Sequence, residues 1–236
     1  MSGAPEGAGA AGRVPGGPAR PGAGPEPTPT PPEASVPEGF EAVLEGWDGL
    51  GAMIRHDAPT GTWIFVAIHD VTMGRAVGGC RMRVYERPEQ GLWDALRLAR
   101  GMTYKWASID IPFGGGKSVL AVPRPLEGEE RRGLLHRFGA LLNGLGGAYA
   151  TGEDLGTTPS DMAELATVTR WVKGVDPEGR GLPTDPGPFT ARGVFEAMRA
   201  GLAHRFGSPD LEGRTVVVQG AGDVGAPLAR LIAAAG

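Results

Sequence analysis

The chain has 236 residues, a formal net charge of -4 and one cysteine. The net negative charge argues against the basic surface that nucleic-acid-binding proteins have. A single cysteine excludes a disulfide framework and a multi-cysteine metal site. No apolar run reaches the roughly 18 residues of a membrane span and no signal-peptide core is present, so we expect a soluble, cytoplasmic protein.

Glycine and proline gather at the start of the chain. The sequence has 41 Gly and 22 Pro, and residues 1–38 include no Leu, Ile, Phe, Tyr or Trp. Such a segment cannot bury enough apolar surface to offset the entropy lost on ordering. We therefore predict a disordered tail over residues 1–38 and a folded chain from residue 39.

Helix and strand patterns alternate after the tail. Apolar residues spaced three and four apart predict a short amphipathic helix from Phe40 to Met53, and a dense β-branched and aromatic run predicts a buried strand at residues 63–69. The segment 78–84 is expected to be a loop that feeds a second strand. The elements expected next are a helix at 89–107, a glycine turn at 112–117 entering a strand at 118–122, a helix at 127–145, a strand and loop at 149–154, and a helix capped by Thr158.

This alternation predicts an α/β domain with a mostly parallel sheet over residues 39–185, to which we assign substrate binding and oligomerisation. A Gly- and Pro-rich stretch at 181–188 predicts a domain boundary. A helix at 193–206 and a strand at 215–219 are expected in the second domain, residues 186–236.

The second domain carries the pattern Gly220-x-Gly222-x-x-Gly225 between a predicted strand and a predicted helix, which is the context of a dinucleotide fingerprint. Its glycines make the turn, admit a pyrophosphate and pack helix on strand, while helix N–H groups face the phosphates. The alternative is a glycine-rich turn without a cofactor. Asp223 adds a negative charge at the phosphate site, and Pro227 is expected to leave a carbonyl unpaired or to bend the helix.

Lys105 and Lys117 are the candidate chemical groups. Two cations in one pocket oppose each other's charge, so one pKa falls, and such a lysine can act as a general base near neutral pH. The glycines at 114–116 favour close approach of a ligand to the backbone, and Asp154 is a plausible partner. The alternatives are two solvated surface lysines and an acid that only caps a loop. The four histidines show no metal-ligand spacing with Cys or acidic residues.

Six ordered blocks resemble the glutamate, leucine, phenylalanine and valine dehydrogenase family, most closely its leucine-type branch. The blocks are residues 76–82, 94–105, 114–117, 153–157, 190–194 and 211–214, the last leading into the glycine fingerprint. The resemblance implies an amino-terminal α/β domain followed by the incomplete start of a Rossmann-type dinucleotide-binding domain. It also implies NAD-dependent, reversible oxidative deamination of an L-amino acid to a 2-oxo acid and ammonia.

The resemblance also implies residue roles. Lys105 would pair with the substrate α-carboxylate, Lys117 would be the catalytic base, and Asp154 would exchange protons with the amino group. The other residues so implied are Val77, Gly78, Gly79 and Met102 at the substrate, Thr190 near the nicotinamide, and Gly220, Gly222, Asp223, Val224 and Gly225 at NAD.

Val77 bears on the substrate. Glutamate-specific relatives have a lysine at the matching position, whereas an apolar Val77 would leave a side-chain carboxylate unpaired and desolvated. We therefore expect leucine, valine or phenylalanine to be preferred over glutamate. The alternatives are a glutamate dehydrogenase and a catalytically silent relative that serves as a binding or oligomerisation module. The resemblance further implies a homo-oligomer.

The sequence also departs from the family pattern. Asp223 stands where the family commonly has Asn, Gly187 replaces a Ser, and Trp106 is bulkier than the small polar residue usual after the substrate lysine. Family chains continue beyond the length seen here, and the acid that would hold the ribose lies about 20 positions past the fingerprint. We therefore expect this chain alone to bind NAD poorly and to be inactive.

Overall fold

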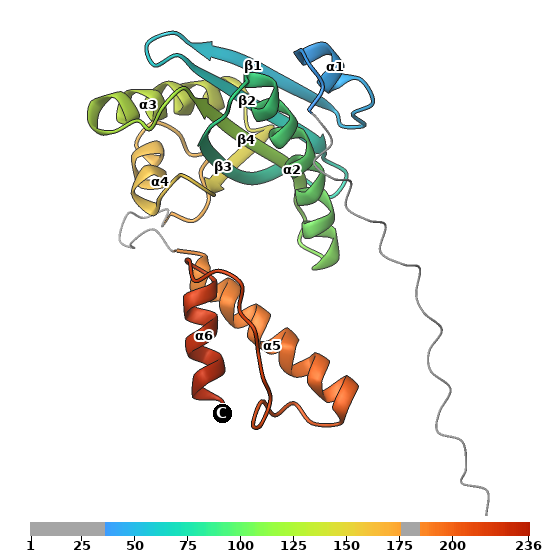
Figure 1. The fold of residues 1–236 in the computed structure, drawn as a ribbon. Coiled ribbons are helices and arrows are strands. Elements are labelled where there is room, and N and C mark those ends of the chain that lie inside the picture. The colour runs from blue at the N-terminus through green and yellow to red at the C-terminus, as the bar shows by residue number, and fades with distance from the viewer. Residues whose placement is uncertain (1–35, 176–184) are drawn as a thin grey trace, which may run out of the picture. The chain divides into compact units, whose positions relative to one another are not determined.

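A computed structural model describes residues 36–175 and 185–236. The first region is built on a five-stranded sheet with strand order β1-β2-β4-β3-β5 (Figure 1). The strands are β1 (Gly51–Asp57), β2 (Thr62–Asp70), β3 (Ala76–Val84), β4 (Gly114–Val122) and β5 (Tyr149–Glu153). The α/β class and the buried strand expected at 63–69 are confirmed.

The sheet is mixed, so the expectation of a mostly parallel sheet is wrong. β1 pairs antiparallel with β2, and β2 pairs antiparallel with β4. β3 pairs in parallel with both β4 and β5. Only β3, β4 and β5 are joined through helices, and a helical crossover returns the chain in the same direction, whereas the short turn between β1 and β2 reverses it.

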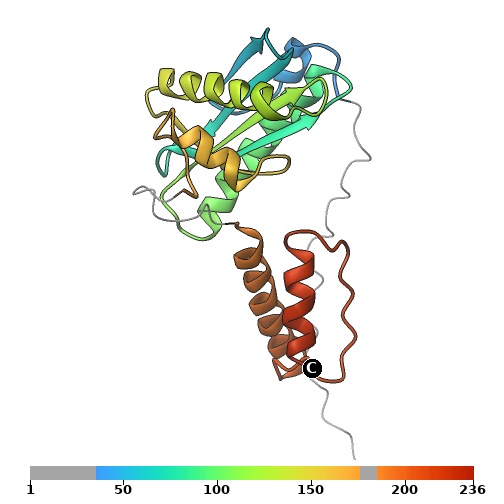
Figure 2. The ribbon, with the colours of Figure 1, turned by 90° about the vertical axis from the view of Figure 1, so that its left-hand side faces the viewer.

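Helices cover both faces of the sheet. The helix α2 (Pro88–Ser108) packs on one face, over a cluster that includes Phe65, Leu96 and Val119. The helices α3 (Gly128–Gly144) and α4 (Pro159–Ala166) belong to the opposite face, and Figure 2 shows α3 crossing the sheet. All nine residues of β4 are buried, because side chains alternate between two covered faces. β4 is therefore the centre of the core.

The beginning of the folded region differs from expectation. The helix α1 spans only Phe40–Leu44, and Met53 lies in β1 instead. Gly46 has a φ of 78°, a left-handed conformation that glycine adopts readily and that ends a helix. Val36 already packs against the apolar cluster below α2, so order begins before residue 39. The rest of the expected tail, residues 1–35, lies outside the described residues.

Two glycine-rich segments that were expected to be loops or turns are strands. Gly78 and Gly79 lie within β3, and Gly114 begins β4. The helix expected at 89–107 is confirmed as α2, and the helices expected at 127–145 and after Thr158 are confirmed as α3 and α4.

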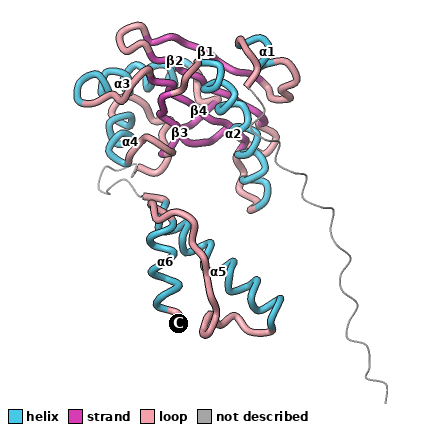
Figure 3. Tube along the Cα trace, viewed as in Figure 1, coloured by secondary structure: helices cyan, strands magenta, loops and turns pink. Residues whose placement is uncertain are grey.

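The second described region contains the helices α5 (Gly187–Phe206) and α6 (Gly225–Ala234), which pack side by side (Figures 1 and 3). The strand expected at Thr215–Gln219 is absent: these residues form a loop, and Val217 is 87% exposed. A strand is held by hydrogen bonds to a neighbour, and none of the described residues pairs with this segment. Of the expected boundary at 181–188, residues 181–184 lie outside the described part. No helix at 36–175 or 185–236 is long and apolar enough to cross a membrane.

Candidate functional site

Lys117 lies in the middle of β4 and is only 3% exposed. Its Nζ is 2.9 Å from Oδ1 of Asp154, the residue that directly follows β5. Burial lowers the pKa of Lys117 because the charged form loses its hydration, and Arg81 adds to this effect while Asp154 opposes it. The direction of this pKa shift is the one that a lysine base requires.

Gly79 leaves the space that this ion pair occupies, and the neighbouring Gly78 leaves space for the backbone of Gly116 and the side chain of Met102. A Cβ placed on Gly79 would stand 2.7 Å from Cβ of Asp154 and 3.1 Å from Nζ of Lys117. A Cβ on Gly78 would collide with the carbonyl oxygen of Gly116 and would approach Cγ of Met102 to 3.3 Å. The structure thus brings together five residues that the sequence predicted separately.

Asp154 is held from a second side by Arg81. The Arg81 Nε donates to Oδ2 of Asp154 at 2.8 Å, and its Nη1 donates to Oδ2 of Asp94 at 2.8 Å. Burial acts to raise the pKa of Asp154, but Lys117 and Arg81 outweigh it, so this pKa lies below its ordinary value. Asp154 is consequently an anion fixed at both oxygens.

Sequence reasoning assigned no role to Arg81 or Asp94, although both lie in the matching blocks. Asp94 is a 5% exposed carboxylate on α2, and the hydroxyl of Tyr85 donates to it at 2.7 Å. Asp94 occurs inside a run of apolar residues with helical spacing, and acidic residues are almost never fully buried unless paired. That position in the sequence could have identified Asp94 as a buried, paired carboxylate.

A buried polar cluster from β4 and β5 contacts the backbone of Gly78. The Tyr149 hydroxyl lies 2.9 Å from the carbonyl oxygen of Gly78 and 3.1 Å from Oγ of Ser118, which in turn contacts Oγ1 of Thr151 at 3.2 Å. Burial raises the pKa of Tyr149, so its phenol stays protonated and remains a donor. Burial also raises the pKa of the Cys80 thiol to about 12, which makes it a poor nucleophile.

The prediction that Lys105 and Lys117 are both buried in one dry pocket is wrong, because only Lys117 is buried. Lys105 lies in the last turn of α2 and is exposed, with Nζ 5.9 Å from the ring centroid of Trp106. Trp106 is instead half-buried, and its indole N–H donates to the carbonyl oxygen of Val77 at 3.0 Å. Successive helical residues point about 100° apart, so only one of the two faces inward. The cation beside Lys117 is Arg81.

The glycine fingerprint adopts a tight turn before α6. Gly220 has a φ of 85°, a Cβ on Gly222 would meet no atom within 4 Å, and a Cβ on Gly225 would collide with the carbonyl oxygen of Gly220. The space above Gly222 and the first turn of α6 suit the pyrophosphate of a dinucleotide, so the residues present fit this group. Asp223 and Val224 lie between Gly222 and the first residue of α6.

Pro227 lies in the first turn of α6. The backbone N–H groups of its neighbours Ala226 and Leu228 bond the carbonyl oxygens of Gly222 and Val224, whereas proline has no N–H to donate the corresponding bond to the carbonyl oxygen of Asp223. A Cβ on Gly187 would stand 2.5 Å from the carbonyl oxygen of Asp223, which explains why glycine fits better than serine. The Thr190 hydroxyl is exposed and donates to the carbonyl oxygen of Pro186 at 2.9 Å.

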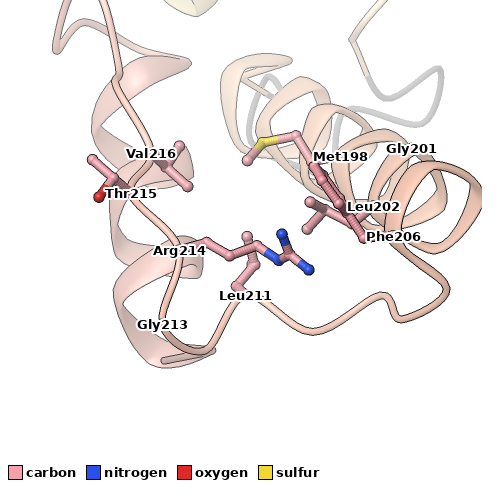
Figure 4. A pocket seen from close by; sticks show the side chains of 9 residues that line it. All are labelled: Met198, Gly201, Leu202, Phe206, Leu211, Gly213, Arg214, Thr215 and Val216. Carbon is pink, nitrogen blue, oxygen red and sulfur yellow. The ribbon is translucent and has the colours of Figure 1, made fainter.

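A separate cavity of about 500 Å³ lies between α5 and the segment that follows it (Figure 4). Its lining is mostly apolar and includes Met198, Leu202, Phe206 and Leu211. None of the fingerprint glycines takes part in it, so the cavity is distinct from the phosphate turn.

Comparison with known proteins gives consistent matches. Residues 60–171 match the family model described as Glu/Leu/Phe/Val dehydrogenase, dimerisation domain. The chain is 43% identical over 188 residues to a leucine dehydrogenase from Geobacillus stearothermophilus, with 79% of this chain and 50% of that protein covered. It is 40% identical over 181 residues to a phenylalanine dehydrogenase from Lysinibacillus sphaericus, with 77% and 47% covered.

The fold also matches a solved structure. The crystal structure of L-tryptophan dehydrogenase from Nostoc punctiforme aligns with a TM-score of 0.60 and 37% identity, covering 81% of this chain and 52% of that one. The chain therefore spans about half the length of the curated relatives it matches.

Proposed function

Because the chain belongs to the Glu/Leu/Phe/Val dehydrogenase family, in its leucine dehydrogenase-like branch, we propose that it catalyses NAD-dependent oxidative deamination of an apolar L-amino acid to a 2-oxo acid and ammonia. One observation carries the proposal. Lys117 is only 3% exposed, and its Nζ lies 2.9 Å from Oδ1 of Asp154. The same Nζ lies against the backbone of Gly79, where no side chain intervenes.

Lys117 is the general base in this proposal. Its lowered pKa increases the neutral fraction near neutral pH, and a neutral amine can take a proton from the water that attacks the oxidised substrate carbon. Asp154 holds a proton transiently on its way to or from the substrate amino group. Lys105, at the exposed end of α2, pairs with the substrate α-carboxylate, and the backbone of Gly78 and Gly79 borders the substrate.

The cofactor would lie at the turn formed by Gly220, Gly222, Asp223, Val224 and Gly225. The open space above Gly222 supports binding of the pyrophosphate, and Thr190 is proposed to lie near the nicotinamide. When bound, NAD accepts the hydride removed from the substrate. Residues 39–185 are proposed as the substrate-binding and oligomerisation domain, and residues 186–236 as part of the NAD-binding domain.

Val77 supports an apolar substrate. It is 5% exposed in β3, and it offers no charge to a substrate carboxylate, whose desolvation without a partner is unfavourable. The relatives described above act on leucine and phenylalanine according to their names. We also propose a homo-oligomer, supported by the dimerisation-domain description of the matched family.

The test is NADH formation by the intact protein with leucine, valine, phenylalanine and glutamate. We expect the three apolar amino acids to exceed glutamate, and we expect Lys117→Ala to lower kcat by a factor of about 10² or more. Arg124→Ala is the control, because it removes only exposed contacts, namely the ion pair with Glu130 and a hydrogen bond to the carbonyl oxygen of Pro125. Equal or better turnover of glutamate would refute the specificity. Full activity of Lys117→Ala would refute the role of Lys117, and a folded protein that oxidises none of these substrates would indicate a catalytically silent relative.

A further inference from the structure

Asp154 is placed by the chain but oriented by its partners. It follows β5 directly, and its backbone N–H is bonded to Oγ1 of Thr157 at 3.0 Å. That bond fixes the backbone and leaves the carboxylate free to rotate about its side-chain torsions. The orientation of the carboxylate therefore depends on what binds its two oxygens, which are Nζ of Lys117 at Oδ1 and Nε of Arg81 at Oδ2.

We propose that Arg81 is a positioning residue, whose guanidinium, anchored on Asp94, holds the Asp154 carboxylate beside Lys117. The proposal rests on the function proposed above and adds a residue to that site. Arg81 is itself well placed for this, because its side chain is 15% exposed while that of Asp94 is 7% exposed. The two nitrogens of one planar group thereby connect the loop after β5 to α2.

The anchor is rigid because α2 and Tyr85 hold it. Nη1 of Arg81 and the hydroxyl of Tyr85 both bond Oδ2 of Asp94, at 2.8 Å and 2.7 Å. Arg97 pairs with the other oxygen of Asp94 from the exposed side of the helix. A guanidinium can bridge two carboxylates in a fixed plane, whereas the single ammonium of a lysine cannot reproduce this geometry.

Arg81 also affects the charge state of Lys117. The titratable groups that act on Lys117 are Asp154 after β5 and Arg81 and Cys80 on β3, while its partner on β2 is the uncharged Ala67. The helix α2 adds two titratable residues: Lys105, which is exposed, and Asp94, which is linked to the site through its ion pair with Arg81. Burial is the main cause of the low pKa of Lys117, and the positive charge of Arg81 lowers it further. Loss of that charge should let Lys117 keep its proton to a higher pH.

The test compares Arg81→Met, Arg81→Lys and Asp94→Asn with the control Arg97→Ala in the intact protein. Arg97 binds the same carboxylate but its side chain is 53% exposed and does not bond Asp154. Each variant is first checked for native circular dichroism. We then measure kcat, KM and the pH profile of kcat/KM, using the amino acid that the wild-type protein oxidises fastest.

We expect Arg81→Met to lower kcat about 100-fold, because a catalytic group misplaced by about 1 Å loses a factor of this size. KM should change much less, and the acidic limb of kcat/KM should move to higher pH. Arg81→Lys and Asp94→Asn should fall between Arg81→Met and the wild type, and Arg97→Ala should match the wild type.

A second readout does not depend on turnover. The chain has three lysines, Lys105, Lys117 and Lys173, so protein labelled with ¹³C-lysine gives three side-chain signals, which Lys105→Arg and Lys173→Arg variants assign. We expect the Lys117 signal to titrate at higher pH in Arg81→Met than in the wild type. This comparison decides the role of Arg81 even if the protein oxidises no amino acid, which would refute only the proposed function.

The proposal is overturned if folded Arg81→Met keeps the wild-type kcat, pH profile and Lys117 titration. It is also overturned if Arg97→Ala causes the same losses, because any lost contact to Asp94 would then have this effect, whether or not the residue bonds Asp154. If Arg81→Met does not fold, Arg81→Lys and Asp94→Asn decide the question by the same two readouts, and wild-type values in both variants would overturn it.

Discussion

At Gly79 the backbone of β3 passes so close to the ion pair that no side chain fits. We predict that Gly79→Ala destabilises the fold by about 1–3 kcal/mol, the usual penalty for overpacking, and lowers activity more than 10-fold, because the added methyl group pushes apart Lys117 and Asp154. Urea unfolding and the amino acid oxidation assay measure the two effects.

Gly101 is the matched control for this substitution. It lies in α2 with no atom within 4 Å of a built Cβ. Gly101→Ala should therefore stabilise the protein by about 0.5–1 kcal/mol, because alanine loses less backbone entropy in a helix. If both substitutions changed stability equally, the packing account of Gly79 would be wrong.

The residues of the site could be predicted from sequence only in part. Gly78, Gly79, Lys117 and Asp154 belong to motifs whose spacing is informative, and the structure brings them together. The neighbour of Lys117 was wrongly expected to be Lys105, since spacing along the chain does not show which helical residue faces inward. Arg81 was missed because a pairing across two strands and a helix depends on the sheet order.

The start of α4 depends on a reciprocal cap. Thr158 Oγ1 accepts from the backbone N–H of Asp161 at 3.2 Å, and the Asp161 carboxylate accepts from the Thr158 N–H at 2.7 Å. We predict that Thr158→Ala lowers the free energy of unfolding by about 1 kcal/mol, as loss of an N-cap does, whereas Thr158→Ser retains most of it. Thermal unfolding of the two variants provides the check, and equal losses would mean that the hydroxyl is not the stabilising group.

Helices and strands could be predicted where the hydrophobic pattern in the sequence is long and has clear ends. α2, α3 and β2 carry sustained periodicity or a dense apolar run, and all three were anticipated. The helix expected from Phe40 to Met53 ends at Leu44 because Gly46 turns the chain and the following residues pair with β2. The strand expected at 215–219 illustrates the same limit, because local sequence favours a strand but hydrogen bonds to a neighbour must form it.

Among the residues that the structure describes, three buried carboxylates and one partly buried carboxylate bind arginine or lysine and have pKa values below their ordinary value. The buried ones are Asp57, Asp94 and Asp161, and the partly buried one is Asp154. A carboxylate of this kind stabilises the fold fully above its unfolded pKa of about 3.9, and the contribution is lost as pH falls through the folded-state pKa. We predict that the free energy of unfolding changes little from pH 7 to 5 and falls steeply below about pH 4, as measured by urea unfolding.

Asp57 allows this acid dependence to be dissected. Its side chain is 1% exposed and accepts from Nε and Nη2 of Arg137 at 2.6 Å and 2.9 Å. Asp57→Asn should lower the free energy of unfolding by about 2 kcal/mol at pH 7, in the range measured for hydrogen bonds to charged groups. Below pH 4 its free energy of unfolding should fall less steeply than that of the wild type. A variant with the wild-type slope would show that this pair does not contribute to acid unfolding.

The central claim is that Lys117 is a buried lysine that releases its proton more readily than a free one. The most direct measurement is the titration of its ¹³Cε signal in the wild-type protein, followed from pH 6 upward. The account predicts a midpoint below the ordinary lysine pKa of about 10.4, because burial outweighs the attraction of Asp154. A midpoint at or above that value would contradict it, since Lys117 would then be an ordinary cation paired with a carboxylate.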